Sequence, residues 1–533
     1  MPGLRLPAVL MKSLLTLLPV LFFASLGHAA DGNGISSDKI DRLAQRAMKE
    51  FNVPGMAIGV VRDGQVIYAK GHGIRELGQP EAVDVDTMFK IASNSKAFTS
   101  AALAILVDEG RISWDGAVAD YIPEFRMADP WITAKISVTD LLSHRSGLVA
   151  HAGDLMLWPD PNLFTRRDII RGLRYFPLVS DFRDSYNYDN VLYIVAGEIV
   201  PRITGQSWES FVDERIMGAL DMNRCFAGEI PANEMTNLAA PHGEIEGELT
   251  VIERSRIHAE PAVYAAAGGV VCSVSDMLKW VSMHLGRGTA PDGTVLFSPA
   301  RSREMWSPEN WWGVSARNYE WHRTHFNGYG LGWRLSDVHG YKEVSHTGSL
   351  AGMRAWTLMV PELDLGIVVL ANGSNTSARN AVMHTIKYSF LPVQERDWVA
   401  TYKEMDEREE QASEEEKEVD SAAFTRPVLE ARPLEQYSGR YRDAWFGDVS
   451  ISASEKGLEF ASARSPKLSG LLEHVTADTF VAHWPDRSVG MDAWIRFEFD
   501  RDGNMHRIRM NRVFDSPDAT IDYFEYLDLK PTD

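Results

Sequence analysis

One stretch of the chain, residues 91–109, has to be buried in any fold that this sequence adopts. Helix-forming and weakly polar residues follow one another there, among them Ala101-Ala102-Leu103-Ala104-Ile105-Leu106, and Gly110 is a suitable stop. A helix that is apolar nearly all round needs packing partners on every side, so we expect it to be central. The length of 533 residues exceeds what one hydrophobic core usually organises, so two or more domains are expected.

Helix and strand patterns flank this segment. A short amphipathic helix is predicted from Ser36 to Phe51, and two apolar runs after it form a hairpin across Asp63-Gly64. A later helix ends near Phe390. The strand-like runs lie at 56–61, 66–69, 331–335, 353–360 and 366–370. Helices combined with antiparallel strands in this order predict an α+β fold.

The pattern changes after residue 395. Residues 403–420 carry ten acidic side chains against three basic ones, which is typical of a solvated helix or linker. Farther on, Ile495, Phe497 and Phe499 alternate with polar residues, and Asp502-Gly503 turns the chain into a returning strand. We predict a signal peptide at 1–30, a main domain at 31–395, an acidic helical linker at 396–430 and a small all-β barrel domain at 431–533.

The N-terminus has the pattern of a secretory signal peptide. Met11-Lys12 is followed by an apolar run from Leu14 to Leu26 and then by the small residues Gly27, Ala29 and Ala30. The run is short for a membrane span, so a retained anchor is the weaker alternative. We expect a periplasmic or secreted protein without a stable membrane anchor. A formal charge of −20 argues against nucleic acid as a partner.

Only two cysteines are present, Cys225 and Cys272, so a disulfide scaffold is excluded. Cys272 ends the apolar run Gly268-Gly269-Val270-Val271. We interpret it as a buried, inert thiol, and a Cys225–Cys272 bridge is the less favoured alternative.

A candidate nucleophile opens the apolar helix. Ser93-Asn94-Ser95-Lys96 places a serine and a lysine three residues apart, on one face of the helix. A lysine without water loses its proton more easily and can then act as a base toward the serine, while the helix N-terminus offers N–H groups to an oxyanion. A second match, Ser36 to Lys39, has no apolar helix behind it and is interpreted as a coincidence.

Two further motifs follow in order, Tyr188-Asp189-Asn190 and His346-Thr347-Gly348. With these three elements the sequence resembles the serine β-lactamase-like family, which includes class C β-lactamases, D-alanyl-D-alanine carboxypeptidases and related esterases and peptidases. The resemblance covers about residues 35–390 and extends to the segments 89–92, 141–148, 329–333 and 370–373. It implies a β-lactamase/transpeptidase-like antiparallel sheet with a helical subdomain. The final domain resembles the small lipocalin-like barrels found behind such hydrolases.

The resemblance also implies the role of each site residue. Ser93 is the acylated nucleophile, Lys96 its base, and Tyr188 the phenol that passes a proton to the leaving group and activates water. Asn190 holds a substrate carbonyl, and the backbone N–H groups of Ser93 and Ser349 form the oxyanion hole beside the substrate-binding residues His346, Thr347 and Gly348. The implied chemistry needs no metal and no organic cofactor.

One departure from the family pattern bears on the substrate. β-Lactamases and carboxypeptidases of this family mostly carry lysine where this chain has His346, and a neutral imidazole supplies no fixed charge for a substrate carboxylate. We therefore expect an exported serine hydrolase for ester, amide or peptide bonds of small substrates. Short linear peptides, some with D- or unusual residues, are favoured because an appended domain restricts access. The alternatives are an esterase, a β-lactamase, a D,D-carboxypeptidase and an inactive sensor or scaffold, and a homo-oligomer is left open.

Other polar and aromatic residues have simpler interpretations. His144, in a turn, is expected to satisfy backbone groups. His322 and His325 are close in sequence but lack a third ligand, so no metal site is predicted. The tryptophans between residues 306 and 333 are interpreted as core or rim residues, with an aromatic wall for an apolar substrate as the alternative.

Overall fold

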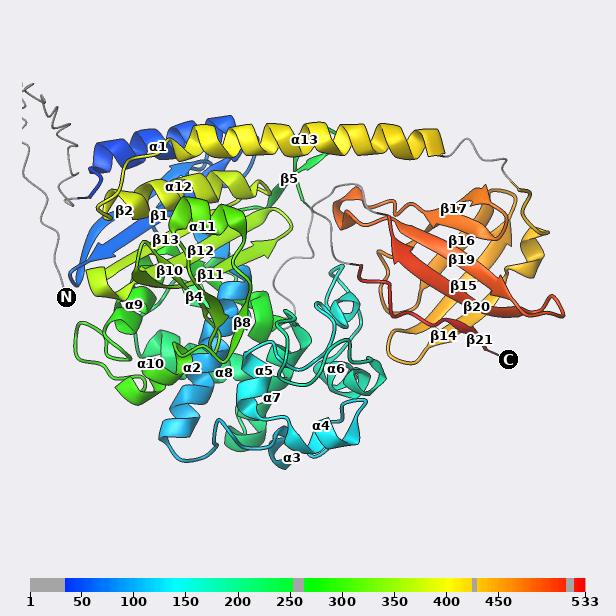
Figure 1. Ribbon diagram of the computed structural model, residues 1–533, viewed down its shortest axis with the longest axis horizontal. Helices are drawn as coiled ribbons and strands as arrows, with labels where there is room; N and C mark the ends of the chain where they lie inside the picture. The colour runs from blue at the N-terminus through cyan, green and yellow to red at the C-terminus, as the bar shows by residue number, and fades with distance from the viewer. Residues whose placement is uncertain (1–33, 253–262, 424–428, 514–521, 533) are drawn as a thin grey trace, which may run out of the picture.

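The computed structural model describes residues 34–252, 263–423, 429–513 and 522–532 (Figure 1). The predicted signal peptide therefore lies outside the described residues. An eight-stranded antiparallel sheet organises the larger part of the molecule, in the order β2-β1-β13-β12-β11-β10-β9-β8. Its strands are β1 (Gly55–Arg62), β2 (Gln65–Gly73), β8 (Asn310–Trp312), β9 (Asn327–Tyr329), β10 (Arg334–Val338), β11 (Tyr341–Leu350), β12 (Met353–Val360) and β13 (Leu365–Ala371).

Most of the strands predicted from apolar runs are present. The hairpin turns at Asp63-Gly64, and β12 and β13 match their expected ranges closely. The strand expected at 331–335 begins only at Arg334, because Gly332 takes a left-handed φ of 79° and turns the chain. The strands β8, β9 and β11 were not predicted, and β11 carries the His346 motif.

Helices cover both faces of this sheet. On one face lie α1 (Ser37–Glu50), α12 (Thr376–Ser389) and the start of α13 (Trp398–Ala423), and on the other lies α9 (Val274–Leu285). Because successive side chains of a strand point to opposite faces, β1 sends Met56, Ile58 and Val60 to the first core and Ala57 and Val61 to the second. The strand is therefore apolar from Gly55 to Val61, and only its last residue, Arg62, is charged.

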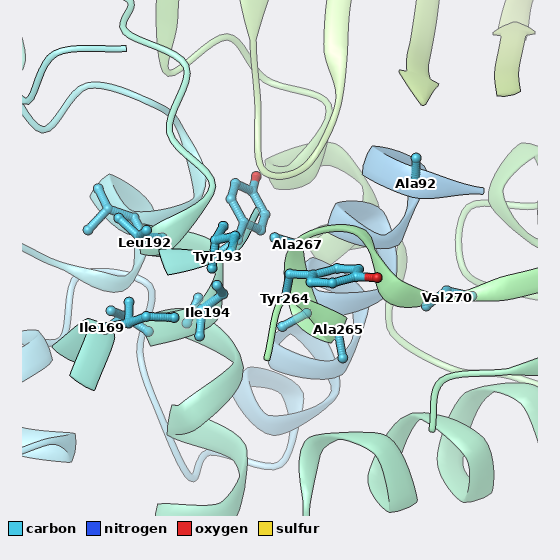
Figure 2. Close-up of a cluster of buried hydrophobic side chains, with 14 of the residues drawn as sticks. Ala92, Ile169, Leu192, Tyr193, Ile194, Tyr264, Ala265, Ala267 and Val270 are labelled. Atoms are coloured by element: carbon cyan, nitrogen blue, oxygen red, sulfur yellow. The ribbon is translucent and has the colours of Figure 1, made fainter. Parts of the chain in front are cut away.

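The predicted central helix is α2 (Ser95–Asp108), and its residues from Ser95 to Leu106 are all buried. It packs against α7 (Val191–Thr204) and the turn Ala265–Gly269, inside a helical subdomain. Figure 2 shows Ala265 and Ala267 of that turn, and Tyr264 just before it, near the side chains of Tyr193 and Ile194 in α7. The other helices are α3 (Val118–Tyr121), α4 (Pro130–Lys135), α5 (Val138–Leu142), α6 (Arg166–Gly172), α8 (Trp208–Val212), α10 (Pro299–Met305) and α11 (Ala316–His322).

A small sheet lies next to the turn Ala92–Asn94, which contains the candidate nucleophile Ser93 and is called the nucleophile turn below. The strands β3 (Met88–Lys90) and β4 (Cys225–Phe226) pair with β7 (Val271–Ser273) on either side, while β5 (His242–Ile245) and β6 (Glu248–Val251) form a separate hairpin. Cys225 and Cys272 face each other in the β4–β7 register and form a disulfide. The interpretation of Cys272 as a free thiol is therefore wrong, because two very short strands, unpredicted from sequence, bring together cysteines 47 residues apart.

The C-terminal part is a nearly closed antiparallel barrel of eight strands, in the order β20-β19-β18-β17-β16-β15-β14-β21. An isolated bridge between Ile508 and Leu529 joins the two ends of this sheet. The strands are β14 (Gly439–Asp443), β15 (Gly447–Ser454), β16 (Gly457–Ser462), β17 (Ser469–Thr476), β18 (Thr479–Ala482), β19 (Ala493–Phe499), β20 (Met505–Arg512) and β21 (Lys530–Pro531). Both the predicted α+β fold and the predicted barrel are confirmed.

The acidic segment forms the long helix α13, which runs over α1 and α12 toward the barrel (Figure 1). Its first turns are not solvated, since Trp398, Val399 and Tyr402 are buried against α12. Among the described residues, no helix combines the length and the apolar character that a bilayer crossing requires.

Candidate active site

Ser93 lies in a tight turn, Ala92–Asn94, immediately before α2. Ala92 has a left-handed φ of 49°, a conformation that is costly for a residue with a side chain. Two hydrogen bonds hold the turn: Ile91 N donates to Val270 O at 3.0 Å, and Val270 N donates to Ser95 Oγ at 3.0 Å. The backbone around Ser93 is thus fixed from both sides.

Lys96 lies one turn into α2 and is fully buried. Its Nζ is 3.2 Å from Ser93 Oγ, and it donates to Asn190 Oδ1 at 2.7 Å and to Ala267 O at 2.9 Å. Burial lowers the pKa of Lys96 to about 7, although the carboxyl groups of Asp154 and Asp189 act in the opposite direction. A large fraction of this amine is therefore neutral at neutral pH and can accept a proton from Ser93.

Tyr188 completes the group, from the loop just before α7. Its hydroxyl hydrogen-bonds Ser93, and Lys96 Nζ lies 4.8 Å from the centre of its ring. Burial raises the pKa of the Tyr188 phenol well above its usual range, and the hydrogen bond to Ser93 offsets only part of this. The phenol is consequently protonated at neutral pH, so it is suited to give a proton rather than to take one.

Asn190 connects the lysine to an aspartate–histidine pair, Asp154 and His151, that sequence reasoning missed. Its Nδ2 donates to Asp154 Oδ2 at 2.7 Å, and Asp154 Oδ2 also lies 2.8 Å from His151 Nδ1. Asp154 is only 1% exposed, so its carboxylate must be satisfied by such partners. The chain Lys96, Asn190, Asp154 and His151 is therefore one hydrogen-bonded network at the rim of the site.

The third predicted motif lies on β11, opposite the nucleophile turn. A Cβ at Gly348 would lie 2.1 Å from Ile91 O, so only glycine lets the strand approach the turn this closely. Thr347 and Ser349 line the same cavity as Ser93, while Gly348 makes the contact with the turn. This places the strand beside Ser93, where the N–H of Ser349 is expected to serve as an oxyanion donor.

His346 carries no charge in this setting. Burial lowers its pKa well below the usual value, and the neighbouring Arg334 and Lys96 lower it further. Its Nδ1 lies 2.7 Å from Thr347 O and must donate, so Nε2 accepts from the Tyr329 hydroxyl at 2.8 Å. The imidazole thus supports the strand and supplies no fixed positive charge, as the sequence predicted.

A cation that sequence reasoning missed lies on the neighbouring strand, in β10. Arg334 lines the cavity, and its guanidinium lies 5.8 Å from the ring centre of Tyr188 and 5.7 Å from that of Trp312. Within the described parts of the chain it forms no ion pair, and its Nε is buried without a hydrogen-bond partner. The site therefore does contain a fixed positive charge, although His346 does not supply it.

The other histidines, the second serine–lysine match and the tryptophans considered from the sequence have mainly structural surroundings. His144 Nδ1 accepts from Asp189 N at 3.0 Å, a backbone role. His322 pairs with the Tyr388 hydroxyl and His325 with Asp337, and the described residues hold no cluster suited to a metal ion. Ser36 and Lys39 lie exposed at the start of α1. Of the tryptophans, Trp306 and Trp333 are in the core and Trp311 is exposed, while Trp312 stacks on Tyr186 near Arg334.

Most of the predicted site residues line one cavity of about 650 Å³, within the usual size range of ligand sites. Ser93, Tyr188, Asn190, His346, Thr347 and Ser349 line it, and the buried Lys96 reaches Ser93 beneath it. The predicted residues are therefore gathered in one place. Sequence reasoning did not predict several other residues that line the cavity, because no motif marks them in the sequence. They are His151, Asp154, Arg334 and residues of the barrel.

Comparison with known proteins gives two family matches. The family model described as Beta-lactamase matches residues 40–387, and a second one, described as a domain of unknown function (DUF3471), matches residues 425–530. The first covers more than half of the chain and includes all three motifs.

Among curated proteins, the unguisins hydrolase ungD' of Aspergillus campestris is 27% identical over 443 residues, 79% of each chain. Penicillin-binding protein 4 of Amycolatopsis lactamdurans is 29% identical over 341 residues, 61% of this chain and 82% of that one.

Two solved structures share the fold. The octameric penicillin-binding protein homologue from Pyrococcus abyssi matches with a TM-score of 0.57 and 21% identity, over 93% of this chain and all of the other. A class C β-lactamase from Rhodobacter sphaeroides matches with a TM-score of 0.53 and 20% identity, over 66% of this chain and 98% of the other. With the family model spanning the sheet, the helical subdomain and the Ser93 site, this chain belongs to the β-lactamase family.

Proposed function

We propose that this protein is an exported serine hydrolase that cleaves amide, peptide or ester bonds of short substrates through an acyl-enzyme on Ser93. The observation that carries the proposal is the buried Lys96, with its pKa near 7 and its Nζ 3.2 Å from Ser93 Oγ at the cavity. A neutral amine at this distance is what a serine needs to become a nucleophile.

The groups divide the proton transfers between them. Neutral Lys96 takes the Ser93 proton as Oγ bonds to the substrate carbonyl carbon, and the N–H groups of Ser93 and Ser349 stabilise the oxyanion. As the bond to the leaving group breaks, the protonated Tyr188 gives it a proton and regains one from Lys96. Water then attacks the acyl-enzyme by the reverse of these transfers and releases the acid.

Arg334 supports a substrate that carries an anionic group. A guanidinium that lines the cavity without an acidic partner in the described chain can bind a carboxylate by paired, charge-assisted hydrogen bonds. The sequence alone favoured substrates without this carboxylate, because His346 is neutral. The geometry instead favours short peptides with a free carboxylate, near enough to the serine for Arg334 to bind it.

The first experiment asks whether Ser93 becomes acylated and on what. A fluorophosphonate probe should label the wild type and not Ser93→Ala, and short D- and L-aminoacyl amides and peptides should turn over faster than nitrocefin. Equal labelling of Ser93→Ala would contradict the assignment of the nucleophile. Nitrocefin turnover comparable with that of the peptides would favour a β-lactamase, and a wild type that is labelled but never turns over would favour a sensor.

The second experiment tests Arg334. In Arg334→Met, KM for peptides with a free carboxylate should rise about 10- to 100-fold, the range for one lost charged contact. The same peptides with an amidated end serve as the control and should change little. Equal effects on acid and amide would show that Arg334 supports the fold of the site and does not read the substrate.

Export is part of the proposal and rests on the signal-like residues 1–30 and on the Cys225–Cys272 disulfide, a bond that persists in oxidising compartments. A homo-oligomer also stays a proposal, and light scattering of the purified chain would give the number of subunits.

A further inference from the structure

We propose that the C-terminal barrel is a wall of the substrate site and sets the length of substrate that the site admits. The inference rests on the proposed hydrolase function, and it assigns a role to the part of the chain that matches only a domain of unknown function.

The barrel is attached to the helical subdomain at the segment that leads into α6. Arg464, two residues after the end of β16, donates to Leu163 O at 3.0 Å and forms an ion pair with Asp168. Its own carbonyl accepts from Leu163 N at 2.8 Å, and its guanidinium lies 4.4 Å from the ring centre of Phe164. Backbone and side chain of one residue therefore fix the two parts together.

Aromatic packing extends this attachment. The rings of Phe164 and Phe446 lie 5.7 Å apart, and those of Phe176 and Trp445 lie 4.9 Å apart, centre to centre. Through these contacts the buried residues of the barrel and of the helical subdomain form one continuous hydrophobic cluster. Such an interface holds the barrel in a defined position rather than as a loosely tethered module.

In that position the barrel contributes directly to the cavity. Val489, Met491, Arg512 and Tyr523 line it from the barrel side, together with catalytic residues such as Ser93 from the other side. A cavity of about 650 Å³ that is shared in this way has room for a substrate of drug-like size. A longer peptide that extends from Ser93 toward this side of the cavity meets the barrel residues.

The wall comes close to the reacting groups. His151, held by Asp154, lies between the two parts: its ring centre is 5.5 Å from that of Tyr188 and 6.2 Å from that of Tyr523. One side chain therefore separates the barrel from the phenol that serves as proton donor. A substrate group that extends past Tyr188 on this side meets Tyr523.

The test widens the wall and compares substrates of different length. In Met491→Ala and Tyr523→Ala, kcat/KM for a six-residue peptide relative to a two-residue peptide of the same series should rise about tenfold, as expected for relief of a steric limit. Hydrolysis of p-nitrophenyl acetate, an ester with no peptide length to vary, is the reference rate to which both peptide rates are normalised in each variant. Leu471→Ala is the matched control, since Leu471 is a barrel residue that is 47% exposed and does not line the cavity.

A third variant, outside the cavity lining, guards against a local folding defect at Met491 or Tyr523. Arg464→Ala loosens the attachment without entering the barrel core, and it should raise the same ratio. An unchanged ratio in all three variants, with ester hydrolysis intact, would overturn the inference. A uniform rise for every substrate, the ester included, would also overturn it, because the barrel would then obstruct the site without selecting. A wild type that never acylates Ser93 would overturn the proposed function and this inference with it.

Discussion

In the proposed mechanism the reaction depends on Lys96 as the base, and the environment of this residue predicts how the activity changes with pH. Because burial lowers the pKa of Lys96 to about 7, the neutral base is present above this pH and is lost below it. We predict that kcat/KM for p-nitrophenyl acetate rises with pH through a midpoint near 7. Steady-state rates between pH 5 and 9 measure this, and a flat profile would contradict the assignment of Lys96 as the base.

Replacing the amine gives the second prediction. Lys96→Met removes the base and should lower kcat/KM by about 10²- to 10⁴-fold, the usual contribution of a general base. The protein should still fold, since an apolar side chain replaces one that burial already disfavours in its charged form. Circular dichroism and thermal unfolding provide the control. Activity within tenfold of the wild type would show that another group takes the Ser93 proton.

Among individual residues of the site, those that belong to a sequence motif were predicted. Those that only the fold brings to the site were not. Ser93, Lys96, Tyr188 and His346 lie in short motifs, and the resemblance of these motifs to those of the serine β-lactamase-like family implies their roles. Arg334 is in a strand with no recognisable motif. It lines the cavity only because β10 lies beside β11. No local pattern in the sequence distinguishes such a residue from a surface charge.

Among the elements, β11 depends on one glycine. In Gly348→Ala the new Cβ would lie 2.1 Å from Ile91 O, so the strand has to move away from the nucleophile turn. We predict a loss of about 10²-fold or more in kcat, the cost of a misplaced oxyanion donor, with little loss of global stability. Gly313→Ala is the matched control, because a Cβ there has nothing within 4 Å. Equal kcat in the two variants would show that the strand tolerates the shift.

The disulfide links two strands beside the nucleophile turn, since β7 pairs with both β4 and β3. Closing a loop between cysteines 47 residues apart lowers the entropy of the unfolded chain. This raises the free energy of the unfolded state by about 4 kcal/mol at 25 °C. We predict that Cys225→Ala/Cys272→Ala lowers the free energy of unfolding by about 2–4 kcal/mol, measured by denaturant titration. Reduced wild type should behave like the double variant, and an unchanged midpoint would contradict the bridge.

Long, strongly patterned elements were predictable and short ones were not. The apolar run of α2, the amphipathic α1 and the alternation in β19 each indicate one structure over many residues. The strands β4, β7 and β8 have two or three residues each, too few to show a period, and they form because neighbours supply the pairing. The missed disulfide follows from two of these strands.

For the whole molecule, export is the expectation that an experiment can settle most directly. We predict that protein recovered from the periplasm or medium begins at Asp31, because Gly27, Ala29 and Ala30 suit a signal peptidase. Intact mass spectrometry measures this. Charged substitutions in the run Leu14–Leu26 should retain the precursor in the cell, and exported protein that still begins at Met1 would contradict cleavage.

The cavity that both parts of the molecule line has a consequence for divergence within the family. Tyr523 and Ser93 are more than 400 positions apart in the chain, yet they border the same space. Mutations in the barrel can therefore change which substrates enter while every catalytic motif stays the same. Relatives that share those motifs would catalyse the same type of reaction on different substrates. The differences in substrate specificity would then correlate with differences in the barrel sequence.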